Sequence, residues 1–546
     1  LVQTGGTLNC PRYLAIGSAT GTGMASFLSG NAVIGASDNA YRIIVGDGSG
    51  ATAIANLGTM AGGDATITHY STTGLYVGSG SPGTFNLNSG TLSLGGPIRQ
   101  GTYLGTVNLN GATIVAMSDG INIMNDTVDG VVVYKKGITI DTGANNVVIS
   151  SDIGGFTGNG VYIEGGKLTV ADGGSGYLGA PFVTIASTSG TGASAIATLS
   201  DGSVNELLFT CPGDGYNAGD VLTFTFQGGG TDTPAPEFTY TLTAADLQAN
   251  AEGQFIKIGS GTLTTQAESL QDYPGDTLVK EGTFAANGLF GDSAIIVSPG
   301  ATLTGNLDSY GPVVIEGEGT FNPGDSTGSA MSTASLTLEA GSEMGIDIAD
   351  WDGTAGTSYD TTTFDSLVIN ATTTDKLTIR LDIAATTVPT ESQQFVIATA
   401  ANGISGLTAD NWTIVENGPT ASSNWSLSAT ATQLILTYTP GESTGDGYDD
   451  WVATYPGLAD TDPSADPDGD GIANLLEYVL GTDPSQASSG VLPTVEETAE
   501  GMAFSFVRST DAKDSTTQVL QTSTDLINWT DTEIPSATSG NVEITS

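Results

Sequence analysis

The chain has 546 residues, of which 59 are Asp or Glu and only 12 are Lys or Arg, so its formal net charge is −47. A field of this sign repels nucleic acids and anionic membranes, and we expect neither as a partner. No run of about 18 apolar residues occurs, which predicts no transmembrane helix and no membrane insertion. The same charge attracts divalent cations and suits a salty medium that screens self-repulsion.

The composition favours strands over helices. Gly accounts for 77 of the 546 residues, about twice the usual share, and the charged fraction of 13% is about half the usual value. Surface polarity must therefore come from Ser, Thr, Asn and Asp, which suit short strands joined by tight turns. The two cysteines, Cys10 and Cys211, are each followed by Pro. They can form a disulfide if the protein is exported, although two isolated thiols are the favoured interpretation.

The first 170 residues contain an imperfect repeat of short strands. Three apolar residues followed by Gly recur at 14–18, 43–47 and 75–79, and the alternating segment 85–88 is echoed 22 residues on at 107–110. Such strands at a period of about 20–30 residues are typical of a solenoid, in which stacked rungs share one core. We therefore predict a right-handed parallel β-helix over 1–170, with Asn and Thr ladders at its corners. An antiparallel β-sandwich is the alternative.

A different pattern follows at 171–245. The sequence Gly-x-Gly-Tyr ends at Tyr177 and again at Tyr216, and strand-like runs follow both copies. We predict a compact antiparallel β insert with internal two-fold similarity, in which the two tyrosines pack in turns. The solenoid pattern resumes over 246–438.

One segment of this second region resembles a known repeat. Residues 257–264 read Lys-Ile-Gly-Ser-Gly-Thr-Leu-Thr, residues 273–277 read Tyr-Pro-Gly-Asp-Thr, and a Gly-Thr-Phe strand closes the unit at 282–284. This is similar to the autotransporter-associated β-strand repeat of large exported bacterial passenger proteins. The chain departs from that pattern at Thr265, where Leu is typical. The resemblance implies an exported β-solenoid with a passenger-like end, and it brings no active site with it.

The C-terminal part is organised differently. A linker begins at 439, and the region 439–491 contains the only confident helical segments, at 448–455 and 472–480. Strand-like runs in 492–546 predict a small Ig-like or fibronectin-like sandwich that the end of the chain cuts short. The chain begins and ends within strand-like patterns, which indicates a fragment of a longer precursor.

One motif carries chemistry. The segment from Asp466 to Glu477 matches the D-x-D-x-D-G-x5-E calcium loop at every position. Ca²⁺ takes six to eight oxygen ligands, and the loop spacing supplies them. The predicted ligands are the side chains of three aspartates, a backbone carbonyl, a water-bridged Asn and a closing bidentate Glu: Asp466, Asp468, Asp470, Ile472, Asn474 and Glu477.

The predicted calcium site is similar to the loops of thrombospondin type 3 and dockerin segments. Asp460, Asp462 and Asp483 flank it, and they are candidates for a second ion. A cation that neutralises several carboxylates orders a loop that would otherwise repel itself, so the binding energy becomes folding energy. We therefore expect a structural role for the ion.

Three functional hypotheses follow. The first is a non-catalytic extracellular structural protein of a bacterial surface, a filament or matrix-fibre subunit that associates head to tail through its open ends. The second is a monomeric autotransporter-type adhesin that binds glycans or surfaces. The third and weakest is a β-helical polysaccharide lyase, for which the adjacent Lys135 and Lys136 are the only paired bases. Trp412, Trp425 and Trp529 are predicted to be core residues, and His69 an ordinary strand residue.

Overall fold

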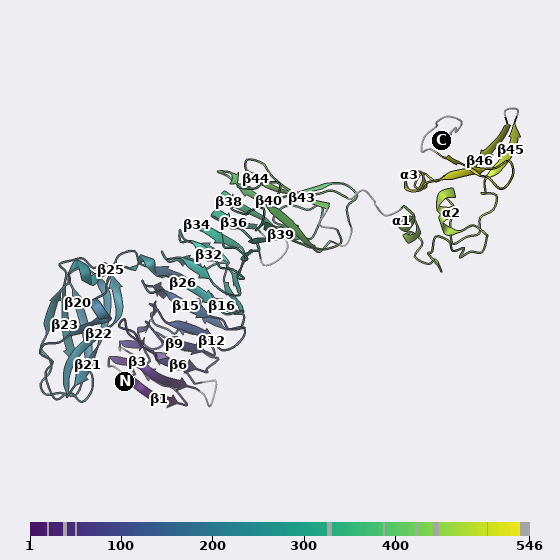
Figure 1. Cartoon of the computed structure of the whole chain (residues 1–546). Coiled ribbons are helices and arrows are strands. Elements are labelled where there is room, and N and C mark those ends of the chain that lie inside the picture. Colours follow the sequence, from purple (N-terminus) through teal and green to yellow (C-terminus); the bar gives the residue numbers. More distant parts are fainter. Residues whose placement is uncertain are drawn as a thin grey trace. The chain divides into compact units, whose positions relative to one another are not determined.

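The computed structural model describes residues 1–18, 21–35, 41–49, 52–324, 330–385, 388–420, 424–440, 447–498 and 501–534. They belong to two compact units, 1–439 and 440–546, and each unit is described by itself. The first unit is a stack of short parallel strands with an antiparallel insert at its side (Figure 1). The second unit is small and contains the helices of the loop region.

One face of the stack is a continuous parallel sheet. Within the described residues it contains thirteen strands, each paired with its equivalent one coil later. They are β2 (Leu14–Ile16), β4 (Ile43–Val45), β7 (Leu75–Val77), β10 (Ile98–Gln100), β13 (Asn122–Met124), β16 (Val147–Ile149), β27 (Thr262–Thr265), β30 (Thr283–Ala285), β33 (Thr302–Thr304), β35 (Thr320–Phe321), β37 (Glu343–Ile348), β39 (Leu377–Ile383) and β42 (Trp412–Asn417).

Two further faces share a second large sheet, because five long strands run across the corner between them and pair on both sides. These long strands are β1 (Val2–Cys10), β3 (Gly23–Ile34), β34 (Leu307–Ile315), β36 (Ala330–Leu338) and β38 (Thr361–Ile369). The shorter strands of the second face are β5 (Ala53–Leu57), β8 (Gly83–Leu87), β11 (Gly105–Leu109), β14 (Gly130–Val133), β17 (Ile153–Gly155), β28 (Leu270–Asp272) and β31 (Gly288–Phe290). Those of the third face are β6 (Thr66–His69), β9 (Thr91–Leu94), β12 (Thr113–Ala116), β15 (Ile138–Asp141), β26 (Phe255–Ile258), β29 (Thr277–Val279) and β32 (Ile295–Val297).

A single coil shows how the chain winds. It passes through β7, β8 and β9, one strand on each face, and returns to the first face at β10, which pairs in parallel with β7. The echo seen in the sequence between 85–88 and 107–110 is the register of neighbouring coils, since Phe85 lies opposite Val107. The predicted parallel β-helix is confirmed.

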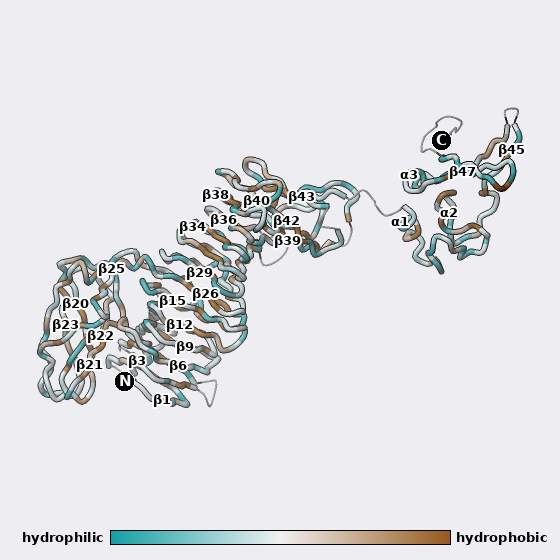
Figure 2. The backbone as a smooth tube through the Cα atoms, in the orientation of Figure 1, coloured by the Kyte–Doolittle hydropathy of each residue, from teal (hydrophilic) through white to brown (hydrophobic). Residues whose placement is uncertain are grey.

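The core consists of apolar columns that run along the stack. Alternate residues of each strand point inward, so β7 buries Leu75 and Val77 and leaves Tyr76 half-exposed. One column joins buried Leu57, Leu87 and Leu109 on consecutive strands. In Figure 2 hydrophobic residues recur along the stacked strands of this unit. Each coil therefore buries its apolar face only against its neighbours.

His69 lies inside one of these columns. It ends β6 between Ile34 and Leu94 of the neighbouring strands, as the predicted strand residue, and it is fully buried. Its Nε2 accepts the backbone N–H of Ile43 at 3.3 Å, while its Nδ1 has no partner. Burial lowers the pKa of His69 to about 4, so the imidazole is neutral near pH 7.

An asparagine ladder lines one corner, as the sequence predicts. Asn56 Nδ2 donates to Ser26 Oγ at 2.9 Å, Asn86 Nδ2 donates to Asn56 Oδ1 at 2.8 Å, and Asn108 Nδ2 donates to Asn86 Oδ1 at 2.7 Å. All four side chains are buried. The ladder satisfies polar groups that burial would otherwise penalise.

The lysine of the resembled repeat has a structural role that sequence reasoning missed. Lys257 is fully buried, and its ammonium donates to the carbonyls of Gly259, Gly261 and Glu281 at 2.5, 2.6 and 2.7 Å. Burial lowers its pKa to about 8, against the opposing charges of Glu281 and Asp141. The three carbonyls use all three donors of the ammonium. This explains how the charged side chain of Lys257 can be buried at this corner.

The insert leaves the helix after β17 and returns at β26. Its strands are β18 (Asn159–Val161), β19 (Lys167–Thr169), β20 (Phe182–Ser187), β21 (Thr191–Ser200), β22 (Ser203–Asp214), β23 (Val221–Gln227), β24 (Phe238–Thr241) and β25 (Leu247–Ala249), with 3-10 turns at Glu164–Gly166, Ala244–Asp246 and Asn250–Glu252. They pair antiparallel as β18–β25, β19–β22–β21 and β20–β23–β24. The predicted boundaries at 170 and 245 are therefore displaced, because β18 and β19 already belong to the insert and β25 closes it.

The insert packs against the corner of the solenoid that carries the asparagines. Asn88 Nδ2 donates to the carbonyl of Thr210 at 2.8 Å, and Asn108 Nδ2 lies 3.6 Å from Cys211 Sγ. Cys211 is buried there and Cys10 is half-buried; both are free thiols, as the favoured interpretation held. Tyr177 and Tyr216 are buried in the insert, where their hydroxyls accept backbone N–H groups.

The first unit ends in antiparallel strands. These are β40 (Gln393–Ala400) and β43 (Trp425–Ala429), which both pair with β44 (Gln433–Tyr438), while β41 (Ile404–Ser405) pairs with β38. Trp351, Phe395, Trp425 and Tyr438 pack together beneath them. Trp425 is therefore a core residue as predicted. The antiparallel strands β44 and β43 extend the second large sheet beyond β40, and β42 is the last strand of the first face.

The second unit contains α1 (Gly447–Ala453), α2 (Asn474–Leu480), α3 (Ala512–Ser515) and two hairpins, β45 (Thr494–Thr498) with β46 (Gly501–Ser505) and β47 (Val519–Thr522) with β48 (Thr530–Glu533). The hairpins form separate two-stranded sheets, so the predicted Ig-like sandwich is not confirmed. Trp529 is 54% exposed, which contradicts its prediction as core. Residues 535–546, the end of the predicted sandwich, lie outside the described residues.

Candidate metal centre

The loop between α1 and α2 is folded around one carboxylate. Asp466 Oδ1 accepts the N–H of Gly469 at 3.0 Å and that of Asp470 at 3.2 Å, and its Oδ2 accepts the N–H of Gly471 at 2.9 Å. Gly469 and Gly471 have φ values of 75° and 89°, a region that side chains disfavour. The glycines of the motif therefore allow the backbone to wrap around Asp466.

Three carboxylates meet in this loop. One oxygen each of Asp466, Asp468 and Asp470 lies within 4.8 Å of the others. Burial raises the pKa of Asp468, and the negative charges of Asp470 and Asp466 raise it further. Like charges this close repel one another, and a cation among them removes that repulsion.

Glu477 brings a fourth carboxylate from α2. Its side chain is fully buried, its Oε1 accepts the hydroxyl of Thr482 at 3.1 Å, and its Oε2 has no partner. Burial raises its pKa to about 7, and the charges of Asp468, Asp470 and Asp466 act in the same direction. A buried carboxylate in this state is costly unless a cation or proton compensates it.

Asn474 completes the inward face of α2. It is fully buried, and its Nδ2 donates to the carbonyls of Asp460 and Asp462, both at 3.0 Å. Its Oδ1 has no partner. Ile472 is buried, and its N–H donates to Asp470 Oδ1 at 2.8 Å. The predicted helix 472–480 thus begins two residues later, at Asn474, and it ends as predicted at Gly481, whose φ is 76°.

The residues fit a hard divalent cation. Three of the six predicted ligands hold buried oxygens without a hydrogen-bond partner: Asp468 Oδ2, Asn474 Oδ1 and Glu477 Oε2. Buried oxygens without partners are rare in folded proteins, and an ion is one of the things that satisfies them. The donors are carboxylate and amide oxygens with no nitrogen or sulfur, which suits Ca²⁺ better than a transition metal.

The flanking acids do not extend the site. Asp462 and Asp483 each accept an N–H and a hydroxyl from the serine two residues later, which lowers the pKa of both. Asp460 likewise accepts the N–H of Asp462. In the described part of the chain the only acidic cluster of this kind is the Asp466–Asp470 group. A second ion is therefore not supported.

Two contacts of the loop were not foreseen. Ser488 donates its N–H to Asp470 Oδ2 at 2.6 Å, and Thr482 holds Glu477 from just beyond the helix end. Neither position belongs to the motif, so spacing alone gave no signal for them. Both contacts fix the direction of a carboxylate that the motif supplies.

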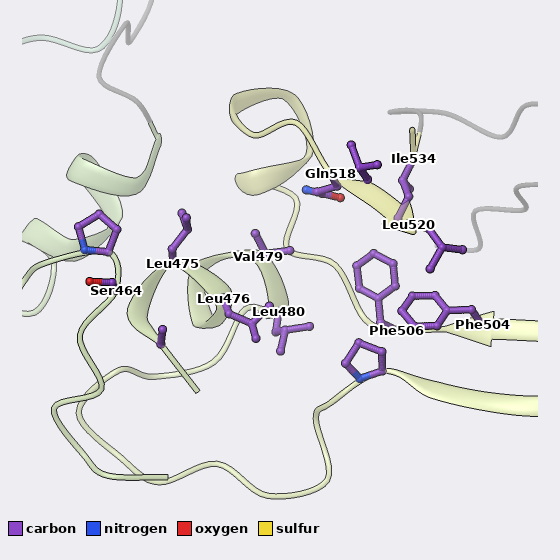
Figure 3. A pocket seen from close by; sticks show the side chains of 14 residues that line it. Ser464, Leu475, Leu476, Val479, Leu480, Phe504, Phe506, Gln518, Leu520 and Ile534 are labelled. Atoms are coloured by element: carbon purple, nitrogen blue, oxygen red, sulfur yellow. The ribbon is translucent and has the colours of Figure 1, made fainter. Parts of the chain in front are cut away.

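The other side of α2 faces an apolar groove of about 540 Å³ (Figure 3). Leu475 and Leu476 are 41% and 40% exposed, and Phe504 and Phe506 also line the groove. Asn474 and Glu477 point inward on another side of the helix, because the helix turns its ligand-bearing residues toward the loop.

The bases considered for a lyase are already engaged. Lys135 forms an ion pair with Glu252 at 2.6 Å, and Lys136 Nζ donates to the carbonyl of Met60 at 2.6 Å. Burial also lowers the pKa of Lys136. Nothing in this geometry favours the lyase hypothesis.

The chain was compared with protein-family models and with curated proteins. No protein-family model matches it, and a search of curated proteins finds no match. Among the described residues, no helix has the length and apolar character needed to cross a membrane.

Proposed function

We propose that this chain is a non-catalytic structural protein of a bacterial extracellular surface, and that its second unit is ordered by one Ca²⁺ ion. The observation that carries the calcium assignment is the set of three buried, unpartnered oxygens on Asp468, Asn474 and Glu477. They lie on the residues that the motif names as ligands. The ion would neutralise carboxylates whose pKa values are raised by burial and mutual repulsion.

The structural role rests on the architecture of the first unit. A continuous core along the stack gives a stiff element whose outer faces carry short polar side chains. The acidic surface keeps such an element soluble and suits a medium rich in cations. We assign the protein to a filament or matrix fibre on this basis, with secretion to the cell surface.

A monomeric adhesin is the second candidate, and one observation favours it. At the end of the first unit the pairing of the second sheet changes from parallel to antiparallel, through β44 and β43. This change interrupts the parallel register that a coil of another copy would have to continue, which disfavours coil-on-coil stacking through this end.

Electron microscopy of the purified chain with calcium, and then with a chelator, separates the two candidates. Regular filaments that fray in chelator support the fibre subunit stiffened by calcium. Isolated rods under both conditions contradict polymerisation and leave the adhesin.

Calorimetry with CaCl₂ tests the ion itself: we expect one site per chain, and an absence of heat would contradict the assignment. Asp466→Asn should weaken binding about 100-fold, equivalent to about 2.7 kcal/mol. Glu497→Gln, an exposed carboxylate of the same unit, is the matched control.

A further inference from the structure

Aromatic rings and guanidinium groups form a row on the first coils of the β-helix. Arg42 Cζ lies 5.9 Å from the ring centroid of Tyr13 and 4.6 Å from that of Tyr76. Arg99 Cζ lies 5.5 Å from the ring centroid of the same residue, Tyr76. At the opposite end, the rings of Tyr13 and Tyr41 are 5.2 Å apart at 81°, and Arg12 lies 5.8 Å from Tyr41. These six residues are called the Arg-Tyr ladder: Arg12, Tyr13, Tyr41, Arg42, Tyr76 and Arg99.

The register of the first face produces this row. Tyr76 of β7 pairs with Arg99 of β10 on one side and with Ile44 of β4 on the other, at the strand spacing of about 4.8 Å. Arg42 lies two residues before Ile44 and reaches the ring of Tyr76 diagonally. The neighbours of Tyr76 in its strand, Leu75 and Val77, are fully buried. Alternation along the strand therefore places Tyr76 on the outer surface of the coil.

The charge of the ladder is unusual for this chain. Acidic residues outnumber basic ones by 59 to 12, and yet three arginines gather here. Within the described residues, the ion pairs found involve Lys135, Lys167 and Arg380 and none of the three ladder arginines. Arg99 donates from Nη1 to the hydroxyl of Tyr76 and to the carbonyl of Thr73, and Arg42 Nε is a buried atom without a partner. Within the described residues the terminal guanidinium nitrogens of Arg12 and Arg42 make no hydrogen bond, so these donors remain for an anionic ligand.

We propose that the Arg-Tyr ladder binds a linear polysaccharide that carries carboxylates, such as a chain of uronic acids. A guanidinium pairs with a carboxylate through two parallel N–H···O bonds. Arginines that recur on successive coils suit a polymer that repeats its carboxylates, and phenol rings offer apolar surface and hydroxyls to the sugars between them.

A short acidic oligosaccharide also fits the overall charge better than a second copy does. Each copy carries −47, so two copies repel over their whole surfaces, while an oligosaccharide brings few charges to the one basic row. The inference goes beyond the proposed function: it holds for a fibre subunit and for an adhesin, and it needs no calcium.

Calorimetry of the full chain with oligogalacturonate tests the proposal, with a neutral glucan oligomer of equal length as the comparison ligand. The experiment is run in EGTA, which removes calcium bridges and keeps its outcome separate from the calcium assignment. We expect binding of the acidic oligomer alone, weakened by added salt. Failure of the wild-type chain to bind it, or equal binding of the neutral oligomer, would overturn the proposal.

Variants locate the site. Arg42→Gln with Arg99→Gln should weaken binding at least tenfold, whereas Lys280→Gln with Lys376→Gln removes the same charge from exposed positions elsewhere in the unit and should leave it unchanged. Arg42→Lys keeps the positive charge but loses the planar guanidinium that can pair with a carboxylate through two N–H groups. This variant should therefore bind with intermediate affinity even if the double variant folds poorly. Equal losses in both double variants would contradict the ladder as the site. Sedimentation showing a dimer that the Arg variants alone abolish would assign the ladder to a second copy and overturn the proposal.

Discussion

The two units of this chain are stabilised in different ways. The first unit stacks coils whose apolar columns continue through the whole solenoid, so each added coil buries its neighbour. The second unit has a small core around Tyr448, Val452, Tyr478 and Ala512, and it leaves the leucines of α2 facing a groove. The difference teaches that a repeat can rely on burial alone, whereas a small acidic unit needs another source of order.

The largest expected effect comes from breaking a column of the solenoid. Leu87 is fully buried between Leu57 and Leu109, so Leu87→Ala should destabilise the first unit by about 2–5 kcal/mol. Denaturant unfolding followed by a probe in each unit measures it. The second unit should unfold unchanged, and a shared loss of stability in both units would show that they are not independent.

The pH dependence of the solenoid should be dominated by His69. Its folded pKa of about 4 lies below the ordinary value of 6.5, so the unfolded chain takes up the proton first. The stability is fully present above pH 6.5 and falls as the pH drops toward 4, by about 3 kcal/mol. Unfolding at stepped pH measures this loss. His69→Leu should flatten this part of the profile, and an unchanged profile in the variant would assign the dependence to carboxylates.

Calcium should act on the second unit alone. At a concentration 100 times its Kd, the ion should add about 2.7 kcal/mol to the unfolding free energy of this unit and nothing to the solenoid. Thermal unfolding with CaCl₂ or EGTA measures it.

Glu477→Gln should change the stability of the second unit in opposite directions with and without calcium. The variant removes a buried charge, so without calcium it should be more stable than the wild type. With calcium it should be less stable, since it loses a ligand. A variant that is less stable under both conditions would mean that Glu477 serves packing and not the ion.

The smallest expected effect concerns the asparagine ladder. Asn86→Ala removes the partner of the buried Asn56 Oδ1 and one of the two partners of the Asn108 amide, which should cost about 1–3 kcal/mol. Serine at the same position keeps a donor and should lose less. Equal losses for the two substitutions would indicate that volume, and not hydrogen bonding, matters at this corner.

The sequence predicts the parts of this molecule that repeat or that match a spaced motif. Coils at 85–88 and 107–110 show their register directly, and the Asp466–Glu477 spacing places the carboxylates that the structure brings together. The insert boundaries were displaced because β18 and β19 alternate like any solenoid strand, and only their antiparallel partners, distant in sequence, reveal their place.

Other features depend on contacts that the sequence does not encode locally. The sequence places apolar residues on one face of α2, but it does not show that Asn474 and Glu477 are the residues buried against the loop. The Arg-Tyr ladder joins residues of four successive coils, in β7 and β10 and just before β2 and β4, so it emerges only from the stacking of the coils.

Hydrogen–deuterium exchange with and without calcium tests the central claim most directly, since it reads both units in one experiment. The account predicts that calcium slows exchange in residues 466–480 and leaves the buried strands β8, β11 and β15 unchanged. Equal exchange of the loop under both conditions would contradict the calcium-ordered unit, and a calcium-dependent change throughout the solenoid would contradict a core that is held by burial alone.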